Sequence, residues 1–330
     1  MSVSRVINGD PSVRSDTRQS VQAAIIALGY APNTAARTLA VGGQLRLGLL
    51  YNNPNTGYSS EFLLGSLEQA SRVGVQIVVE KCARDEHGSE GARRLIKRRV
   101  HGVVLPPPLC ESAEVLKLLA DARVPTVLVA TAVSDSQVLS VGIDDHGAAH
   151  MMTRHIISLG HRRIGFITGS PSLSASAKRL DGYRDALAEG KIPFEDELVA
   201  EGLFTYRSGL DAAEQLLDLA ARPTAIFACN DDMAAAAVAV AHRRGLDVPG
   251  DLTVCGFDDT TMSTAIWPEL TTIHQPIAEM SRAAVKLLVS KIRHPSVSES
   301  AAAEHALLEF TLVRRQSDAA PRRRPPAQRS

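Results

Sequence analysis

The spacing of apolar residues divides the chain into two regions of different character. Before residue 45, apolar side chains recur at helical intervals in short stretches, of which residues 17–28 form the clearest. Turn-forming residues interrupt these stretches at 8–11 and 31–33. After residue 45, uninterrupted apolar runs alternate with amphipathic stretches. The pattern predicts a small all-helical region followed by a larger α/β region.

The α/β region contains two successive sets of strands and helices. Strands of a parallel sheet read as continuous apolar runs, because helices cover both faces of the sheet. In the first set the predicted strands are 47–51, 75–79, 102–105 and 126–129, and the helices are 61–72, 90–98 and 112–122. In the second set the predicted strands are 164–168, 225–229 and 252–257, and the helices are 178–189, 208–221 and 233–244. We therefore predict an α/β fold with two doubly wound, Rossmann-like lobes.

The predicted lobes suggest where a ligand binds. Parallel sheets of this kind bind ligands beyond the carboxyl ends of their strands, so we expect a site in the cleft between the lobes. We assign residues 45–159 and 275–305 to the N-lobe, and residues 160–274 and 306–316 to the C-lobe. The last segment, 317–330, is rich in proline and arginine and has no apolar period, so we expect it to be disordered.

Composition and charge favour a soluble protein with a weakly basic N-terminus. Apolar residues make up 45% of the chain and charged residues 22%, and the formal net charge is zero. Residues 1–46 contain five arginines and two aspartates, and this positive excess suits contact with phosphate. The four cysteines are widely spaced, which predicts buried free thiols. Neither a signal peptide nor a membrane span is evident, so we expect a cytoplasmic location.

Four sequence blocks in the first 40 residues carry a family resemblance. They are SVSRVING at 2–9, TRQSV at 17–21, LGYAPN at 28–33 and ARTL at 36–39, a combination that is highly specific. In these blocks the chain resembles the LacI/GalR family of transcriptional regulators, and the resemblance continues to about Arg315. It implies a helix-turn-helix headpiece with a hinge helix in residues 1–44, followed by a core like that of periplasmic binding proteins. It also implies a repressor that binds operator DNA as a homodimer. The implied effector is a small molecule, a sugar or glycoside, with a nucleobase as the alternative.

The resemblance also implies which residues contact DNA. They are Ser2, Ser4, Arg5, Asn33, Ala36, Arg37 and Leu39. Residues 1–8 correspond to the remainder of a recognition helix that enters the major groove. The hinge segment 34–40 is too short to be a stable isolated helix, and in the family it orders on DNA in the minor groove. There Leu39 corresponds to the leucine that wedges between base steps. The alternatives are a solvated helix face for Arg5 and packing on the lobe below for Leu39.

The headpiece departs from the family pattern at its beginning. The chain starts inside the recognition helix, without the first helix that normally packs across it. We expect the remaining apolar residues to form only a partial core. Two explanations stay open, a start codon placed too late and a true truncation with weak or no operator binding. We favour the first, because the family pattern is undiminished from Val3 to Leu39.

Polar residues that follow the predicted strands are candidates for effector binding. Asp258 follows the strand 252–257, and Asn230 and Asp231 follow the strand 225–229. Recognition of a polyol requires hydrogen-bonding groups of fixed geometry and an apolar face against the ring. By resemblance, Asp258 accepts from sugar hydroxyls. The alternative for all three residues is capping of the segment that follows.

Further candidates come from both lobes. After the first strand, Tyr58, Ser59 and Phe62 are placed to line the cleft, and Asp144 or Asp145 offers a polar contact, for which we choose Asp145. By resemblance, Arg179 reaches into the cleft and Phe204 stacks against the ligand. The alternative for Arg179 is a surface ion pair.

Three other functions are weighed against a regulator. An enzyme is disfavoured because the first strand is followed by neither GxGxxG nor a Walker A loop, and serine nucleophile elbows and metal-ligand spacings are absent. No cofactor or metal is therefore expected. A sugar-binding transport protein requires an export signal and has no use for a headpiece. The third alternative is a truncated regulator that binds its effector and dimerises but does not hold DNA.

Overall fold

The computed structural model describes Val6 and residues 14–27, 44–52, 56–82, 88–131, 138–294 and 305–322. Contacts within the chain divide it into two units, Met1–Leu45 and Arg46–Ser330. In the first unit, helix α2 (Ser15–Ala27) lies where the apolar spacing predicts a helix. The residues expected to contact DNA lie outside the described residues: Ser2, Ser4, Arg5, Asn33, Ala36, Arg37 and Leu39.

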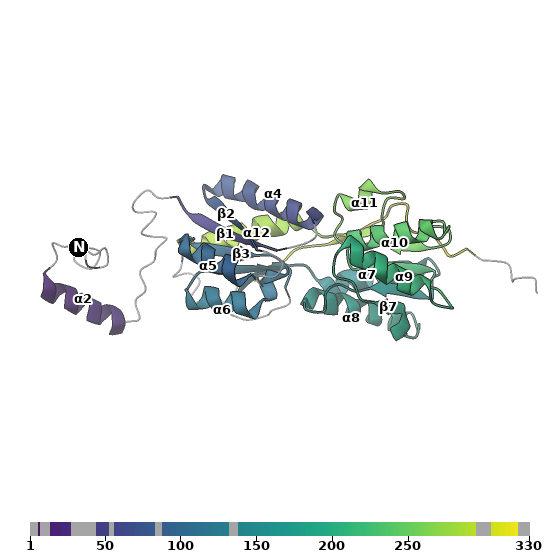
Figure 1. Cartoon of the computed structure of the whole chain (residues 1–330), viewed down its shortest axis with the longest axis horizontal. Helices are drawn as coiled ribbons and strands as arrows, with labels where there is room; N and C mark the ends of the chain where they lie inside the picture. The colour runs from purple at the N-terminus through teal and green to yellow at the C-terminus, as the bar shows by residue number, and fades with distance from the viewer. Residues whose placement is uncertain are drawn as a thin grey trace, which may run out of the picture. The chain divides into compact units, whose positions relative to one another are not determined.

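The second unit begins with a lobe built on a six-stranded parallel sheet of order β11-β5-β4-β3-β1-β2 (Figure 1). The strands are β1 (Arg46–Tyr51), β2 (Gln76–Lys81), β3 (Gly102–Leu105), β4 (Thr126–Val129), β5 (Leu139–Gly142) and β11 (His305–Leu307). The helices are α4 (Thr56–Val73), α5 (Ser89–Lys97), the 3₁₀ helix η1 (Leu109–Glu111), α6 (Ala113–Asp121) and α12 (Ile277–Arg293). Helix α4 packs against α12, and α5 packs against α6.

The second lobe is built on a four-stranded parallel sheet of order β7-β6-β8-β9. The strands are β6 (Ile164–Ile167), β7 (Val199–Ala200), β8 (Ala225–Ala228) and β9 (Thr253–Cys255). The helices are α7 (Asp145–Ser158), α8 (Ser174–Glu189), the 3₁₀ helix η2 (Asp196–Leu198), α9 (Tyr206–Leu217), α10 (Asp231–Arg243) and α11 (Met262–Ala265). Helix α7 packs along α8, and α9 packs along α10. The predicted fold of two lobes with parallel sheets is confirmed.

The chain passes between the lobes near Ile143, near Gln275 and between β11 and β12. The first passage lies earlier in the chain than the expected boundary at residue 159, because α7 belongs with α8 of the second lobe. Strand β12 (Thr311–Val313) pairs antiparallel with β10 (Thr272–His274), so the second and third passages run together as a ribbon.

Both cores consist of the apolar runs that the sequence assigns to strands. Every residue of β3, β6 and β8 is buried. In the second lobe, the Phe166 ring stacks on Tyr183 of α8 at a centroid distance of 4.7 Å and meets Phe227 edge-on at 5.4 Å. Burial of one such side chain stabilises the fold by roughly 1.5–3 kcal/mol.

Polar caps fix the beginnings of three helices of the second lobe. Asp144 caps α7, Thr205 caps α9 and Asn230 caps α10, each by accepting a hydrogen bond from a backbone N–H of the first turn. Such a cap contributes about 1 kcal/mol. Each cap also ends the preceding segment, so that the following helix begins at a defined residue.

Residues 317–322 pack on the second lobe, and the expectation of a disordered segment 317–330 is corrected for this part. The side chain of Asp318 is fully buried and lies 2.7 Å from Nε2 of His155. It also accepts a hydrogen bond of 2.5 Å from the Thr271 hydroxyl. The segment is held by buried polar contacts, which an apolar pattern does not reveal.

The interior of the described part of the chain contains buried thiols. Cys82, Cys110, Cys229 and Cys255 are buried thiols that form no disulfide in the described part of the chain, as the sequence predicts. Within the described ranges, no group of three or more His, Cys, Asp or Glu side chains could hold a metal ion. No helix in the described part of the chain is both long enough and apolar enough to cross a membrane.

Candidate functional site

A cleft of about 930 Å³, partly open to solvent, lies between the two lobes. The first lobe lines it with Tyr58, Pro107, Pro108 and Ala130. The second lobe and the Gln275 passage line it with Ser170, Ser172, Leu173, Ala175, Arg179, Leu203, Phe204, Asp258 and Gln275. The wall is mostly apolar, with a few polar groups, which is the usual character of a small-molecule site.

Arg179 is a buried cation with a fixed orientation on the second-lobe wall. Its Nε and one terminal nitrogen each lie 2.8 Å from one carboxylate oxygen of Asp145, and the other terminal nitrogen donates to the carbonyl of Cys229 at 2.6 Å. The guanidinium carbon lies 3.5 Å from the ring centroid of Phe257. Burial lowers the pKa of Arg179, but Asp145 and Asp258 outweigh burial and raise it, so the side chain stays charged. The surface ion pair considered as an alternative for Arg179 is wrong, because the pair is buried.

Asp258 brings a second acid to the cleft from the loop after β9. Its φ of 107° lies in the left-handed region that residues other than glycine rarely adopt. Its backbone N–H donates a hydrogen bond of 2.9 Å to the carbonyl of Ile273. Only 5% of the residue is exposed. Burial raises the pKa of the Asp258 carboxyl well above its ordinary value, although Arg179 opposes the shift. The carboxyl therefore gains from any partner that donates hydrogen bonds to it.

Gln275 is a cleft residue that the sequence analysis missed. It follows β10, is 1% exposed, and its Nε2 lies 3.5 Å from a carboxylate oxygen of Asp258. Its Oε1 is buried and has no hydrogen-bond partner among the described residues. A buried amide oxygen without a partner is costly, so a ligand donor at this position is favourable. The available signal was a polar residue at a strand end, the same signal that identified Asp258.

Phe204 lies on the cleft wall in a strained but supported conformation. Its φ is 56°, and its carbonyl accepts a hydrogen bond of 3.1 Å from the side chain of Asn230. Gly169 makes room for the ring, because a Cβ at that residue would lie 1.9 Å from the Phe204 Cζ atom. The backbone thus presents the aromatic face to the cleft, and Arg179 lies 6.0 Å from its centroid.

Asn230 and Asp231 are fully buried beside the cleft and do not line it. Asn230 caps α10, which is the alternative that the sequence left open. The Asp231 carboxylate accepts hydrogen bonds from the Thr260 N–H at 2.8 Å and from the Thr272 hydroxyl at 2.6 Å. Burial raises the pKa of Asp231 to about 7, against these hydrogen bonds. Both residues support the wall from behind.

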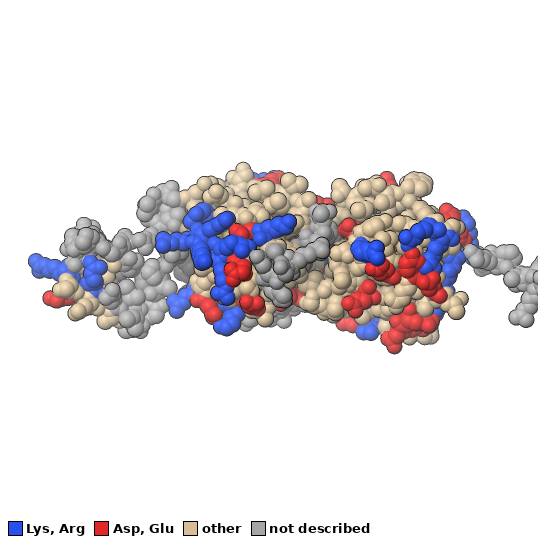
Figure 2. Space-filling model, viewed as in Figure 1, with Lys and Arg blue, Asp and Glu red and all other residues tan. Residues whose placement is uncertain are grey.

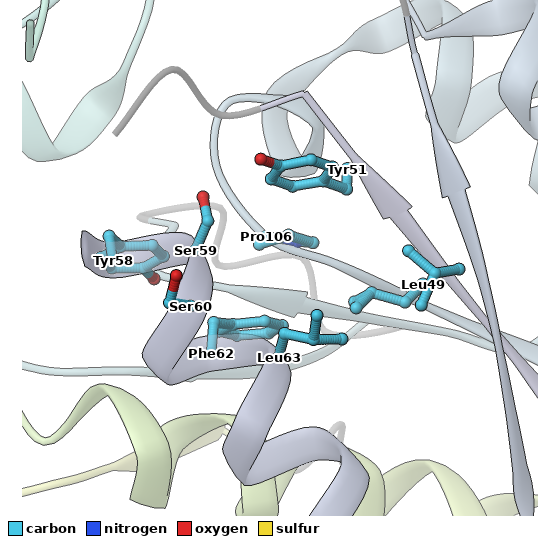
Figure 3. Close-up of a pocket in the computed structure, with 9 residues that line it drawn as sticks. Leu49, Tyr51, Tyr58, Ser59, Ser60, Phe62, Leu63 and Pro106 are labelled. Carbon is cyan, nitrogen blue, oxygen red and sulfur yellow. The ribbon is translucent and has the colours of Figure 1, made fainter. Parts of the chain in front are cut away.

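The first-lobe candidates lie on α4 at the edge of the cleft. Tyr58 lines the cleft and also a neighbouring pocket of about 640 Å³, which Ser59 and Phe62 line with it (Figure 3). The rings of Tyr58 and Phe62 stack at a centroid distance of 6.1 Å. Of the three predicted residues, only Tyr58 meets the second-lobe candidates in one cleft, and Asp145 reaches it through Arg179.

Glu111 of η1 connects the lobes at one end of the cleft. Its carboxylate accepts hydrogen bonds from the N–H of Ser174 at 2.9 Å and from the Ser174 hydroxyl, both at the start of α8. It also accepts from the Thr131 hydroxyl of its own lobe at 3.0 Å. Helix α8 begins without a side-chain cap of its own, so Glu111 supplies the anion that its N-terminus favours. We call this set of contacts the Glu111 clasp.

The geometry suits binding of a small molecule. The cleft offers one acid, one amide, one charged donor and three residues with hydroxyl groups on a mostly apolar surface. Two lobes joined by several passages can change their separation when a ligand contacts both. The fold and the site therefore define the class of two-lobed, ligand-binding proteins.

Comparisons with known proteins agree on the class and extend it to a family. Residues 153–317 match the family described as periplasmic binding protein-like domain, and residues 1–33 match the bacterial regulatory proteins of the lacI family. The chain is 36% identical over 325 residues to the HTH-type transcriptional regulator CelR of Thermobifida fusca, which covers 96% of this chain and 93% of CelR. It is 33% identical over 300 residues to catabolite control protein A of Priestia megaterium, which covers 90% of each.

Solved structures give the same result. The complex of the transcriptional regulator CelR with cellobiose is similar with a TM-score of 0.74 and 33% identity, over 95% of this chain and 94% of that one. The transcription regulator CcpA of Lactococcus lactis is similar with a TM-score of 0.76 and 25% identity, over 83% and 99%. The chain belongs to the LacI family of bacterial regulatory proteins, and it is a ligand-responsive transcriptional regulator.

Proposed function

We propose that this regulator binds a neutral, hydroxyl-rich molecule, a sugar or glycoside, in the interlobe cleft. The observation that carries the proposal is the convergence of Arg179, Asp258 and Gln275, from three separate segments, on a largely apolar wall. Sugar hydroxyls donate and accept, so they match an acid, an amide and a guanidinium together. Phe204 supplies an apolar face for the ring. The similarity to CelR, which is solved with cellobiose, supports this class of ligand.

The charge of the cleft favours a neutral ligand over an anionic one. Asp145 already neutralises the Arg179 guanidinium at 2.8 Å, and Asp258 adds a further acid. A phosphate or carboxylate would find no unpaired cation on the described wall to balance its charge, because Asp145 already neutralises Arg179. Burial disfavours the charged form of the Asp258 carboxyl, and a ligand hydroxyl that donates a hydrogen bond to this carboxyl offsets the cost.

The remaining predicted residues have different roles in this proposal. Tyr58 contacts the effector from the first lobe, and Phe62 holds its ring in place by stacking on it. Ser59 lines the adjoining pocket. Asn230 and Asp231 act as positioning residues, because Asn230 fixes the backbone of Phe204 and Asp231 fixes the segment at Thr260.

The proposed assembly is a cytoplasmic homodimer that binds operator DNA through residues 1–45. An exposed apolar surface on the first lobe supports dimerisation, since Leu64 and Leu67 of α4 are 66% and 45% exposed and Val79 of β2 is 43% exposed. On the second lobe, Trp267 is 74% exposed. Apolar side chains of this size at the surface are expected to be covered by a second copy.

The proposed mechanism couples the cleft to the DNA. The effector favours one separation of the lobes, because it contacts both walls of the cleft. The first lobes of the two subunits then shift relative to each other and separate the segments that precede Arg46, which releases the operator. Repression is therefore relieved by ligand in this scheme.

Two binding measurements test the proposal. Titration calorimetry with cellobiose, galactose, ribose, glucose 6-phosphate and hypoxanthine is expected to show binding of a neutral sugar, and Asp258→Ala is expected to abolish it. Asp211→Ala, which changes an exposed acid on α9, is the matched control. Binding of the phosphate or the base alone would refute the neutral sugar. Unchanged affinity of Asp258→Ala would remove Asp258 from the site.

The DNA half of the proposal has its own test. We expect DNase I footprinting of the DNA upstream of the gene, at low salt and without sugar, to find a protected two-fold site. Addition of the sugar should remove the protection. Absence of any protection would refute operator binding and leave an effector-binding dimer, which is the alternative function.

A further inference from the structure

A dense basic surface lies on the first lobe, around α5 and the turn that follows it. Figure 2 shows lysine and arginine side chains gathered over the part of the molecule where Figure 1 places α5. We call this set the α5 basic surface. Its members are Arg46, Lys81, Arg93, Arg94, Lys97, Arg98 and Arg99.

Acidic partners neutralise only part of this surface. Glu80 lies 2.5 Å from Arg94 and 3.2 Å from Arg98, and Glu90 lies 3.5 Å from Arg93. Seven cations therefore face two acids within the described part of α5, β1 and β2. The neighbouring helix α6 adds one exposed acid, Glu114, besides a Lys117–Asp121 pair. A positive excess remains.

Apart from the ion pairs of Arg94 and Arg98 with Glu80 and the Arg46 contact with the Arg99 carbonyl, apolar packing holds the helix in place. Helix α5 buries Ser89, Gly91, Ala92 and Leu95. Leu95 packs against β1, where a Cβ on Gly48 would lie 2.8 Å from it. The charged residues lie on the opposite side, where Arg93 and Arg98 keep 50% and 54% of their side chains exposed. Mutual repulsion of so many cations is unfavourable, which points to a function outside the fold.

The position of the surface indicates its partner. Arg46 begins β1, directly after the Met1–Leu45 unit. Its N–H donates to Nδ1 of His101 at 3.1 Å, and its guanidinium donates to the carbonyl of Arg99 at 3.4 Å. The end of α5 and its turn are thus fastened to the point where the chain enters the lobe. Five residues, 41–45, lie between the hinge segment 34–40 and Arg46, so the chain can separate the two by at most ~20 Å.

We propose that the α5 basic surface binds phosphates of the DNA that flanks the operator. The inference rests on the proposed function, because it requires the Met1–Leu45 unit to hold DNA. Once the operator is held there, covalent connection keeps the α5 basic surface within reach of the adjoining duplex. Lysine and arginine then replace counterions on the phosphates, a contribution that does not depend on sequence.

The test removes three exposed cations that do not pair with Glu80. The variant Arg93→Gln, Lys97→Gln, Arg99→Gln keeps the ion pairs of Arg94 and Arg98. The matched control removes three exposed arginines of the second lobe, Arg154→Gln, Arg184→Gln and Arg207→Gln. Both proteins should bind the effector as the parent does, which shows that they are folded.

Fluorescence anisotropy measures binding to the footprinted site in duplexes of about 20 and about 40 base pairs, over a range of salt concentrations. For the parent, the longer duplex should bind more tightly and with a steeper salt dependence. The triple α5 variant should lose on the order of 10- to 100-fold in affinity for the longer duplex and reduce its salt slope by up to about 3. It should bind the shorter duplex as the parent does.

The outcomes separate the two proposals. If the parent binds neither duplex, the proposed function fails and this inference fails with it. If the parent binds and the α5 variant shows the same affinities and slopes, only the inference fails, and an acidic protein becomes the better candidate for the surface. Equal losses on both duplexes, or an equal loss in the second-lobe control, would also overturn a specific contact with flanking DNA.

Discussion

The Glu111 clasp makes a prediction about how the lobes respond to effector. In Glu111→Ala, the two hydrogen bonds that cross from Ser174 and the bond from Thr131 are lost together. The clasp joins the lobes beside the cleft, so we expect it to stabilise the separation at which both walls contact a ligand. The substitution should therefore weaken effector binding and leave the fold of each lobe intact.

The magnitude follows from the number and kind of the interlobe bonds. A hydrogen bond to a charged group contributes about 1.5–3 kcal/mol, and the partial exposure of Glu111 places each bond near the lower value. When the two lobes separate, hydrogen bonds from water replace part of the bonds that the Glu111 carboxylate loses. A net change of about 1.5 kcal/mol corresponds to roughly a ten-fold loss of effector affinity. Glu111→Gln, which keeps one acceptor oxygen, should lose less.

Titration calorimetry of the parent, Glu111→Ala and Glu111→Gln, with the sugar that the proposed calorimetric screen selects, measures this loss. Glu114→Gln, which changes an exposed acid in the first turn of α6, is the control for removing a negative charge close to Glu111 in the chain. Small-angle scattering without sugar should show a larger radius of gyration for Glu111→Ala. An unchanged affinity, or tighter binding by Glu111→Ala, would refute the assignment of the clasp to the ligand-bound separation.

Three further predictions concern buried acids and the cleft wall. Burial raises the pKa of Asp258, so the folded state holds a proton that the unfolded state releases above about pH 4. The stability of the folded state should therefore fall as the pH rises above about 4. Thermal unfolding from pH 5 to 8 should show a flatter fall for Asp258→Asn than for the parent. Burial also raises the pKa of Asp318, but hydrogen bonds from His155 and Thr271 outweigh it and the net pKa is lowered. Asp318→Asn should thus cost about 1–3 kcal/mol at pH 7 by denaturant unfolding, a difference that shrinks as the pH falls below about 4. Gly169→Ala should displace the Phe204 ring and weaken effector binding by about ten-fold or more in calorimetry, and unchanged binding would show that the ring does not contact the ligand.

The apolar pattern was sufficient to predict the layers of the fold. Residues 102–105 form a fully buried strand, and so do residues 225–228 of the run 225–229. A strand that helices cover on both faces has no position for a polar side chain, so its sequence is a continuous apolar run. The same pattern did not show that α7 packs with the second lobe, since an amphipathic helix fits either neighbouring sheet. It also gave no sign that residues 317–322 are held, because their contacts are polar.

Contacts between distant segments explain the residues that the sequence missed. Glu111 acts by accepting from Ser174, 63 residues further along the chain, and nothing local to either residue indicates the pair. Gln275 was detectable in principle, because it follows a strand, but β10 is only three residues long and its partner β12 is 37 or more residues away. Short strands whose partners are remote carry little local signal.

A position after a strand therefore identifies candidate cleft residues, but it does not determine where the side chain lies. Asp231 and Asp258 both follow parallel strands of one sheet. Asp231 enters a helix at once, and its carboxylate is held inside by Thr260 and Thr272. Asp258 instead has a φ of 107°, so no helix begins there and the residue lines the cleft. The backbone conformation three residues beyond the strand decides between a supporting and a ligand-facing carboxylate, and at Asp258 that conformation is fixed by its pairing with His274 of β10.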